Sequence, residues 1–525
     1  MLMPRHSAKE KQARQKQARE DHARRKQLGE RGRSRGANPG ASRALAWSFV
    51  NTAVSRLGTL GIGIVLARLL GPEAFGTYAV AFVALAAVLS FNELGVSLAI
   101  VRWPGDPKVI APTVTTISIF SSFVIFIAGY FAAGPFSAAM GDPGAKDVVR
   151  LLLVSVLVNG AVATPAAGLQ REFRQGTRMI IDQVNVWVGA VISVALAVAG
   201  MGAMSLAIGR IAGTVISAGM FIAYSPFPYR LGWEREHVRP LLLFGLPLAG
   251  ASIIVFAVGY ADQLVVGHLL GATMLGFYVL AFNLASWPVS MFSQPLRSVA
   301  PAAFSRLQHA PREMSDAFLA FLRVLAAVAI PVCFFLAGSA EPVIRFVYGA
   351  AWAPAAQALS WLALLAAFRI LFELAYDYLV VLKKSGSLFA VQVVWLVALV
   401  PALLVGAWLG GIAGVALSQV VVAAGVVLPI YLWRLAGSGV RLRAFVSRVW
   451  LPVLLGAGVM AAGSVLATLV VSSFLAALSG GMIALAVIAL LLYLRRSTLR
   501  SLRGFGVPND PVAAPLRIPD VLDRS

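Results

Sequence analysis

The chain carries the stretch RLLGPEAFGTYAVAF at Arg68–Phe82, and a related stretch, HLLGATMLGFYVLAF, follows two hundred residues later at His268–Phe282. Seven residues of the first copy recur at the same spacing in the second: Leu69, Leu70, Gly71, Gly76, Tyr78, Ala81 and Phe82. Self-similarity of this kind indicates an internal structural repeat, although a chance match of small and apolar residues is the alternative. Two glycines and a tyrosine at fixed spacing favour the repeat. The stretch therefore predicts a chain built from two related halves.

The sequence around both copies is apolar enough to lie in a membrane. Of the 525 residues, 59% are hydrophobic and only 13% are charged. A soluble chain has about 45–50% apolar and about 25% charged residues, so an ordinary soluble enzyme is excluded. The apolar runs lack the alternation of barrel strands, which favours helices. We therefore expect an all-α integral membrane protein.

The chain has room for about fourteen transmembrane helices, since each takes about 20 residues. We expect them at 44–67, 74–101, 109–133, 147–170, 177–199, 203–225, 240–267, 274–300, 317–340, 352–382, 386–408, 411–433, 448–472 and 474–494. The repeat joins helices 1 and 2 in the first copy and helices 7 and 8 in the second. Six helices lie between the copies, so both halves have the same orientation in the membrane. This predicts two pseudo-symmetric six-helix lobes related by an axis along the membrane normal, plus two C-terminal helices.

The expected domain organisation follows from these helices. It comprises a basic cytoplasmic tail at 1–42, an N-lobe at 43–225, a cytoplasmic linker at 226–239, a C-lobe at 240–434, two further helices at 435–495 and a cytoplasmic tail at 496–525.

The formal net charge of +22 is unevenly distributed, and its distribution tests the scheme. With the N-terminal tail inside, the inner loops hold seventeen basic residues, among them Arg171, Arg174 and Arg178. The outer loops hold only four: Arg68, Lys146, Arg150 and Arg345. The positive-inside rule therefore predicts that both termini are cytoplasmic in a bacterial plasma membrane.

The basic tails are expected to meet the anionic lipids of the inner leaflet. Nucleic-acid binding is the alternative for the N-terminal tail. It is disfavoured because no aromatic residues are interleaved with the charges. We expect no nucleic-acid partner.

Motifs for enzyme chemistry are missing from the sequence. No phosphate-binding loop for ATP occurs, and the dipeptide Gly-Lys is absent. The single cysteine, Cys333, lies in an apolar run. The histidines have no metal-ligand spacing; they are His6, His22, His237, His268 and His309. The sequence therefore predicts no metal, no cofactor and no enzyme activity.

Several segments in a fixed order resemble the Wzx-type polysaccharide flippases of the multidrug/oligosaccharidyl-lipid/polysaccharide (MOP) exporter superfamily. They are VLARLLGPEAFGTYAV, FNELGVSLAIVR, GLQREFR, DQLVVGHLLGATMLGFYVLAF, PLRSVAPAAFSRLQ and VIRFVYGAAWAPA. The resemblance covers roughly residues 43–434. It implies a transporter that moves a polyprenyl-pyrophosphate-linked oligosaccharide from the inner to the outer leaflet for cell-envelope polysaccharide synthesis, by alternating access through a cationic central cavity.

The resemblance also bears on partners and alternatives. A polysaccharide polymerase and glycosyltransferases would act in the same pathway. One alternative is a multidrug or cation antiporter like the MATE exporters of the same superfamily. Another is a membrane enzyme of lipid-linked sugars, which would be expected to carry a sizeable outer loop with acids, histidine or arginine, whereas the outer loops here are short.

Arginines within predicted helices are the candidate ligands of the pyrophosphate, as the related lipid II flippases imply. Arginine binds phosphate bidentately and keeps its charge, and intramembrane arginines usually face a bundle interior or an aqueous cavity. The candidates are Arg56, Arg369, Arg210 and Arg323. Arg56 lies near the middle of the first helix, about 20 Å along it from Arg43.

Each candidate also has a structural interpretation. Arg56 could pair with Glu93 of the next helix. Arg369 could neutralise Glu373 and Asp377, which follow it at i+4 and i+8. Arg210 and Arg323 could extend toward the nearer membrane surface.

One acidic residue, Asp262, lies near the outer end of the seventh predicted helix. It is a proton or cation site, or a structural acid whose charge is capped by neighbours. The structural interpretation is favoured.

Overall fold

The computed structural model describes residues 39–91, 96–307, 310–382 and 385–494, and side chains from residue 58 onward with some gaps. Regular structure in these ranges is helical throughout, without a strand, so the predicted all-α class is confirmed. The chain forms two compact units, residues 1–62 and 63–525. The described part of the first is the beginning of one helix, and every contact below lies within the second. The predicted tails lie outside the described residues, apart from residues 39–42.

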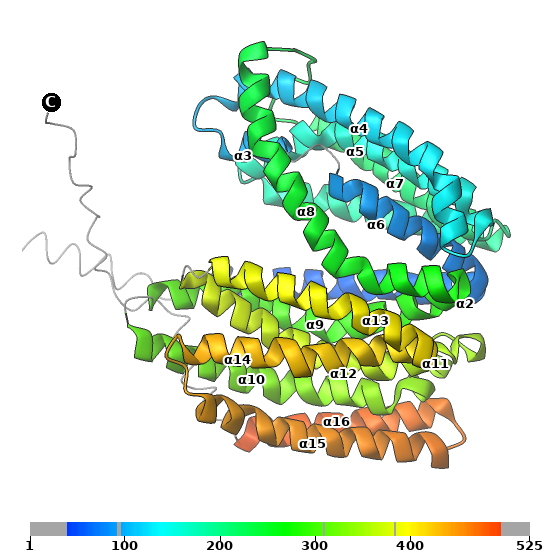
Figure 1. Ribbon diagram of the computed structural model, residues 1–525, viewed down its shortest axis with the longest axis vertical. Helices are drawn as coiled ribbons and strands as arrows, with labels where there is room; N and C mark the ends of the chain where they lie inside the picture. Colours follow the sequence, from blue (N-terminus) through cyan, green and yellow to red (C-terminus); the bar gives the residue numbers. More distant parts are fainter. Residues whose placement is uncertain (1–38, 92–95, 308–309, 383–384, 495–525) are drawn as a thin grey trace, which may run out of the picture. The chain divides into compact units, whose positions relative to one another are not determined.

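The helices follow one another along the whole described chain (Figure 1). They are α2 (Pro39–Phe91), α3 (Ser97–Arg102), α4 (Pro107–Ala139), α5 (Lys146–Arg171), α6 (Gln175–Val198), α7 (Ala203–Ala223), α8 (Arg235–Leu270), α9 (Ala272–Arg306), α10 (Pro311–Gly338), α11 (Ala340–Val347), α12 (Ala355–Val381), α13 (Ser385–Val422), α14 (Leu428–Ala436), α15 (Leu442–Leu469) and α16 (Ser473–Leu494). The π-helical turn Ala423–Val427 joins α13 to α14.

The described residues contain 12 helices that are long and apolar enough to cross a membrane. Two of these helical stretches are interrupted by non-helical glycines, at Gly71 in α2 and at Gly410 and Gly411 in α13. Divided at these points, the helices match the fourteen predicted segments in order. The predicted number is therefore close to the observed architecture.

The boundaries differ in places from the prediction. The second segment was expected to be continuous to residue 101, but α2 ends at Phe91 and the short α3 begins at Ser97. Helix α8 begins at Arg235 rather than at residue 240. The short α11 follows α10 and was not predicted as a separate element. The start of α8 is charged, and α3 and α11 are short. Hydropathy therefore could not reveal these features in the sequence.

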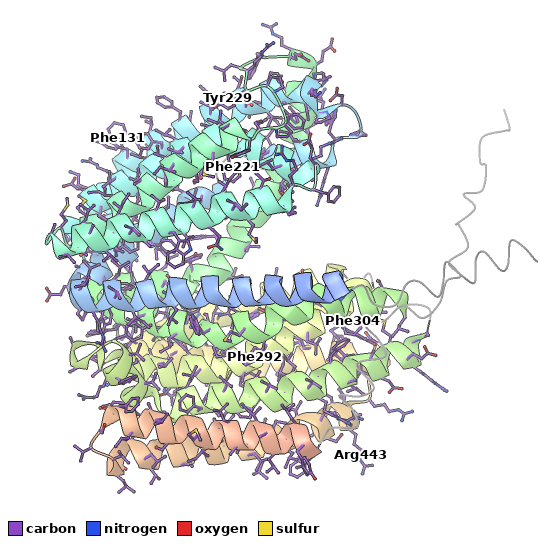
Figure 2. All side chains as sticks on the ribbon, turned by 180° about the vertical axis from the view of Figure 1, so that it is seen from behind. Phe131, Phe221, Tyr229, Phe292, Phe304 and Arg443 are labelled. Atoms are coloured by element: carbon purple, nitrogen blue, oxygen red, sulfur yellow. The ribbon has the colours of Figure 1, made fainter. Side chains whose placement is uncertain are left out.

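Large apolar side chains point outward from the helices. Phe131, Val191 and Val255 are each at least 65% exposed, and Phe131 lies on the outside of the helices in Figure 2. A soluble protein rarely exposes extensive apolar surface, whereas a membrane protein presents such side chains to lipid. The surface therefore agrees with a chain embedded in a bilayer.

The last two helices pack on α10 through small residues. The backbone of Gly338 in α10 lies against Met460 of α15, and Ser339 fills the space beside Gly463 of α15 and Gly480 of α16. Small residues allow membrane helices to approach closely, so dispersion contacts can hold them together without a hydrophobic driving force. The two C-terminal helices are thus attached to the second half of the chain.

The repeat has the same local backbone in both copies. Gly71 has φ 70° and ψ 174°, and Gly271 has φ 85° and ψ 172°. Glycine adopts this region of positive φ readily, whereas other residues avoid it. The two equivalent glycines therefore make the same turn between consecutive helices. The rotation axis that would relate the complete lobes stays a prediction.

The two copies of the repeat also contact each other. A Cβ atom placed on Gly276 would lie 2.9 Å from the Cα atom of Gly76, and one placed on Gly76 would overlap with the backbone oxygen of Ala272. Equivalent residues meet in this way when they lie close to a pseudo-twofold axis. Glycine is required at both positions because any side chain would separate the helices.

Other loops assigned to the outer side gather around this contact. Thr77 donates a hydrogen bond to Asp142 at 2.6 Å, and Nδ1 of His268 lies 2.7 Å from the carbonyl oxygen of Ala139. Arg68 Nε donates to the carbonyl oxygen of Val347 at 2.8 Å. Four loops that the charge count places on one side of the membrane are therefore in contact with one another.

Loops assigned to the inner side also meet. Arg171 donates hydrogen bonds to the carbonyl oxygens of Ile100 and Trp103 at 2.6 and 2.9 Å. Thr116 Oγ1 donates to the carbonyl oxygen of Gly232 in the predicted linker at 2.7 Å. The grouping of loops agrees with the predicted alternation, while the direction of insertion stays a prediction.

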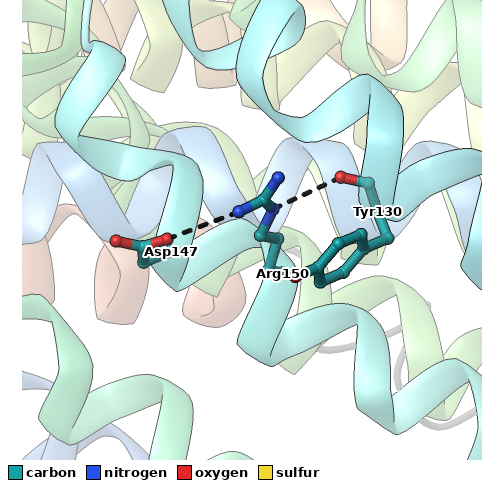
Figure 3. Close-up of polar contacts among 3 residues, drawn as sticks. All are labelled: Tyr130, Asp147 and Arg150. Atoms are coloured by element: carbon teal, nitrogen blue, oxygen red, sulfur yellow. Dashed lines mark hydrogen bonds and ion pairs between the residues drawn. The ribbon is translucent and has the colours of Figure 1, made fainter.

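Two of the four basic residues that the prediction assigns to the outer side, Arg150 and Arg345, have partners within the protein. Arg150 lies 3.9 Å from Asp147, donates to the carbonyl oxygen of Tyr130 at 3.4 Å, and stands 4.2 Å from the centre of the Tyr130 ring (Figure 3). Arg345 pairs with Glu341 at 2.8 Å. These charges are used in local contacts, which agrees with their predicted place on the side that the positive-inside rule expects to be poor in basic residues.

Cysteine labelling of intact cells tests the direction of insertion. Cys333 is fully buried, so a Cys333→Ser chain offers an unreactive background. We expect a cysteine at Val471, between α15 and α16, to react with an impermeant maleimide added outside. A cysteine at Phe173, which is also highly exposed, should react only after permeabilisation. The reverse pattern would contradict the assignment.

Substitution of Gly76 tests the contact between the repeats. Gly76→Ala forces a methyl group against Ala272 and should destabilise the protein by about 1–3 kcal/mol, the usual cost of overpacking. Thermal unfolding of the purified protein in lipid nanodiscs measures the effect. Gly219→Ala is the matched control, because a Cβ at Gly219 meets no atom within 4 Å. Equal melting temperatures for the two variants would contradict the contact.

Candidate functional site

Two of the predicted arginines are held over the same position of the repeat. The guanidinium carbon of Arg210, on α7, lies 5.3 Å from the centre of the Phe82 ring. That of Arg369, on α12, lies 5.5 Å from the centre of the Phe282 ring. Phe82 and Phe282 end the two copies of the repeat. An arginine over an aromatic ring is stabilised by the ring quadrupole and keeps its in-plane N–H donors available for an anion.

The repeated tyrosines lie in the same surroundings. Arg210 interacts with the hydroxyl of Tyr78. Arg369 interacts electrostatically with Asp262 and Tyr278. Each copy of the repeat therefore combines a tyrosine and a phenylalanine with one half-buried arginine from another helix.

Within the described part of the chain, Arg369 does not form an ion pair with Glu373, the nearest acidic residue along α12. Arg369 also has a minor electrostatic interaction with Asp262 of α8. Asp377 is buried, with 7% of its surface exposed, and Glu373 is half-buried. The alternative that Arg369 neutralises Glu373 and Asp377 of its own helix stays a prediction.

The structure shows less about the other predicted site residues. Arg323 lies half-buried on α10. Arg56 belongs to α2, but its side chain lies outside the described residues, and so does Glu93 altogether. Their predicted roles stay predictions.

Asp262 lies in a buried polar cluster formed by three helices. Tyr278 of α9 donates to Asp262 Oδ2 at 2.7 Å, and Gln419 of α13 donates to the same oxygen at 3.2 Å and to the Tyr278 hydroxyl. The backbone N–H of Gln263 donates to Oδ1 at 2.8 Å. Asp262 is 4% exposed and Tyr278 is fully buried. Several donors satisfy this carboxyl group, as a buried polar group requires.

A second polar region is a pocket of about 460 Å³ that is lined by residues of α2, α3, α5, α6, α7 and α8. The described polar residues of its lining are Ser90, Ser97, Asn159, Arg178, Asp182, Asn185, Thr214, Ser217 and Ser252. Arg178 Nε lies 4.0 Å from Asp182 Oδ2, and Arg178 Nη1 donates to Gln170 Oε1 at 2.9 Å. Phe221, labelled in Figure 2, adds an aromatic wall. Pockets that bind small molecules usually have about 300–1,000 Å³, so this one is large enough for a ligand.

A second pocket, of about 800 Å³, runs along the first half of α8. Leu242, Leu243 and Leu246 form much of its wall, and Arg235 and Arg239 stand at its polar end. Basic residues beside an apolar wall suit a lipid with an anionic head group.

The sequence prediction missed the polar pocket and the partners of Asp262. Arg178 counted as a loop charge, although it lies on α6 with Asp182 and Asn185 at i+4 and i+7. This helical spacing was the available signal, since it places the three side chains on one face. No comparable signal links Asp262 to Gln419, because 157 residues separate them.

Known proteins resemble this chain over most of its length. A sequence profile of the family described as "Polysaccharide biosynthesis protein" matches residues 65–357. The succinoglycan biosynthesis transport protein ExoT of Rhizobium meliloti is 26% identical over 62% of this chain and 65% of its own length, just under two thirds. The lipopolysaccharide biosynthesis protein WzxC of Escherichia coli is 22% identical over 77% of this chain and 83% of its own length. The predicted resemblance to Wzx-type proteins is confirmed.

A solved structure has the same fold. The lipid II flippase MurJ, in an inward closed conformation, superposes with a TM-score of 0.71 at 14% identity, covering 86% of this chain and all of MurJ. At this identity the similarity establishes the fold alone. The described helices therefore share the fold of that structure.

The buried cluster around Asp262 predicts a measurable loss of stability. Tyr278→Phe removes the hydroxyl that donates to Asp262, so it should lower the free energy of unfolding by about 1–3 kcal/mol. Asp262→Asn keeps the shape of the side chain and an acceptor oxygen, so a structural role predicts that export survives it. Thermal unfolding and surface polysaccharide are the measurements. Normal stability of Asp262→Asn with complete loss of export would instead favour a proton or cation site.

Proposed function

The chain belongs to the family of polysaccharide biosynthesis proteins, and from this premise we propose that it transports a lipid-linked oligosaccharide across the plasma membrane. The substrate would be an oligosaccharide joined through pyrophosphate to a polyprenol, moved from the inner to the outer leaflet for cell-envelope polysaccharide synthesis. The names of the two relatives, a transport protein and a lipopolysaccharide biosynthesis protein, support this assignment. The flippase fold supports it as well.

The observation that carries the proposal is the pair of arginines over Phe82 and Phe282. A pyrophosphate cannot cross hydrocarbon unaided, because even one charge at mid-membrane costs roughly 3 kcal/mol on insertion scales. Arg369 and Arg210 would offset this cost by binding phosphate oxygens with their in-plane donors. Arg56 and Arg323 would contribute to the same cationic cavity. Alternating access would expose this cavity to each side in turn.

Other parts of the chain fit the remaining parts of the substrate. The apolar cavity along α8, with Arg235 and Arg239 at its end, would receive the polyprenyl chain beside the inner leaflet. The membrane potential would assist an anion that leaves the cell by about 2.3 kcal/mol per charge per 100 mV. Glycosyltransferases would supply the substrate, and a polymerase would use it outside. Both termini would be cytoplasmic.

A MATE-like antiporter is the second candidate, favoured by the buried acid Asp262. In such a protein Asp262 would bind the coupling cation. A multidrug exporter would change the sensitivity of cells to toxic cations and leave surface polysaccharide unchanged.

Arginine substitutions test the proposed transport. Arg369→Ala should abolish export of the polysaccharide while the protein accumulates in the membrane, and Arg369→Lys should restore only part of it, because lysine lacks the bidentate fork. Arg345→Ala is the control, since Arg345 pairs with Glu341 on the short helix α11. The measurements are surface polysaccharide and membrane abundance. Full export with Arg369→Ala would contradict the role of this arginine.

A double substitution separates the two interpretations of Arg56. If Arg56 binds the pyrophosphate, Arg56→Ala remains inactive when Glu93→Gln is added. If the two residues form a structural pair, removal of Arg56 alone leaves an uncompensated acid, and the double variant should recover both abundance and export. A functional double variant would therefore contradict the ligand role.

A further inference from the structure

The polar pocket concentrates hydrogen-bonding groups that no described residue of the protein engages. Within the described residues, no protein partner engages the side-chain amides of Asn159 and Asn185. The hydroxyls of Thr214 and Ser217 donate to carbonyl oxygens of their own helix at 2.8 and 2.9 Å, so their lone pairs remain as acceptors. Polar side chains inside membrane helices are costly unless they meet partners, water or a substrate. The pocket is therefore built to hold a polar molecule.

The charges of the pocket indicate which kind of polar molecule fits. Among the described residues that line the pocket, Arg178 and Asp182 are the charged ones, so the formal charge of this described lining is zero. Amides, hydroxyls and one arginine–aspartate pair offer both donors and acceptors. A pyrophosphate would gain little from such a neutral lining, and Asp182 would repel it. A neutral ligand rich in hydroxyl groups matches the lining better, and sugars have this chemistry.

The pocket lies directly beside one of the proposed phosphate-binding arginines. Thr214 follows Arg210 by one turn of α7, about 6 Å along the helix, and its hydroxyl bonds to the Arg210 carbonyl oxygen. Asn185 of α6 packs against the same helix, since a Cβ at Gly213 would lie 2.7 Å from its Oδ1. A phosphate on Arg210 would therefore place the next unit of the substrate at the pocket.

We propose that this pocket binds the sugar residue attached to the pyrophosphate and selects which sugar the protein accepts. The proposal rests on the proposed function. Asn159 and Asn185 would bind sugar hydroxyls through their amides, with Thr214 and Ser217 as acceptors. Arg178 and Asp182 would complete the inner wall, on the side from which an inner-leaflet lipid enters.

Lipid binding to the full-length protein in nanodiscs tests the proposal. The probes are polyprenyl pyrophosphate without sugar and the same lipid carrying glucose, galactose or N-acetylglucosamine. The unaltered protein should bind at least one sugar-bearing lipid more tightly than the sugar-free lipid. The double variant Asn159→Ala/Asn185→Ala should reduce this preference by roughly ten- to hundredfold, the loss expected for two hydrogen bonds. Its affinity for the sugar-free lipid should not change.

Gln183→Ala is the matched control, because it removes an amide from the same helix at a residue that does not line the pocket. It should leave the sugar preference intact. Equal binding of all lipids by the unaltered protein, or a preference that survives in the double variant, would overturn the proposal. Failure of the unaltered protein to bind any of these lipids would instead contradict the proposed function itself. Thermal unfolding of each variant confirms that its binding is measured on folded protein.

Discussion

Hydrocarbon offers no hydrogen-bond partner, and this constraint governs every polar group inside the helices. The protein satisfies it in two ways. The Asp262 carboxyl group accepts hydrogen bonds from donors on α8, α9 and α13. The arginines over Phe82 and Phe282 and the amides around Asn185 have groups left to bind something else. Under the proposed function, the second kind marks the path of the substrate.

The contact between the two repeats gives this arrangement its framework. Gly76 of α2 and Gly276 of α9 let the backbones of two equivalent helices touch, and the loops assigned to the outer side close around them through Thr77, Asp142 and Arg68. Each repeat then continues into a helix that carries its tyrosine and phenylalanine to an arginine. A short sequence motif thus fixes both the contact between the halves and the place of the candidate anion ligands. Its duplication explains why two sites of similar composition occur in one chain.

The fold could be predicted largely from the sequence, because hydropathy and the repeat are local properties that survive without knowledge of the contacts. Positions such as the start of α8 at Arg235 were missed because polar residues can continue a helix beyond the apolar segment. The arginines could be named because charge in an apolar run is conspicuous. Their aromatic partners, the donors of Asp262 and the pocket around Asn185 arise from contacts between helices distant in sequence, which no local pattern reveals.

Reconstituted transport tests the central claim most directly. The purified protein is placed in liposomes whose inner leaflet holds a polyprenyl-pyrophosphate oligosaccharide, and an impermeant lectin detects the sugar that reaches the outer leaflet. The account predicts that the sugar becomes accessible faster with the protein than in protein-free liposomes, and that Arg369→Ala removes this acceleration. Equal rates with the unaltered protein and without protein, for an oligosaccharide that the host cell itself assembles, would contradict it.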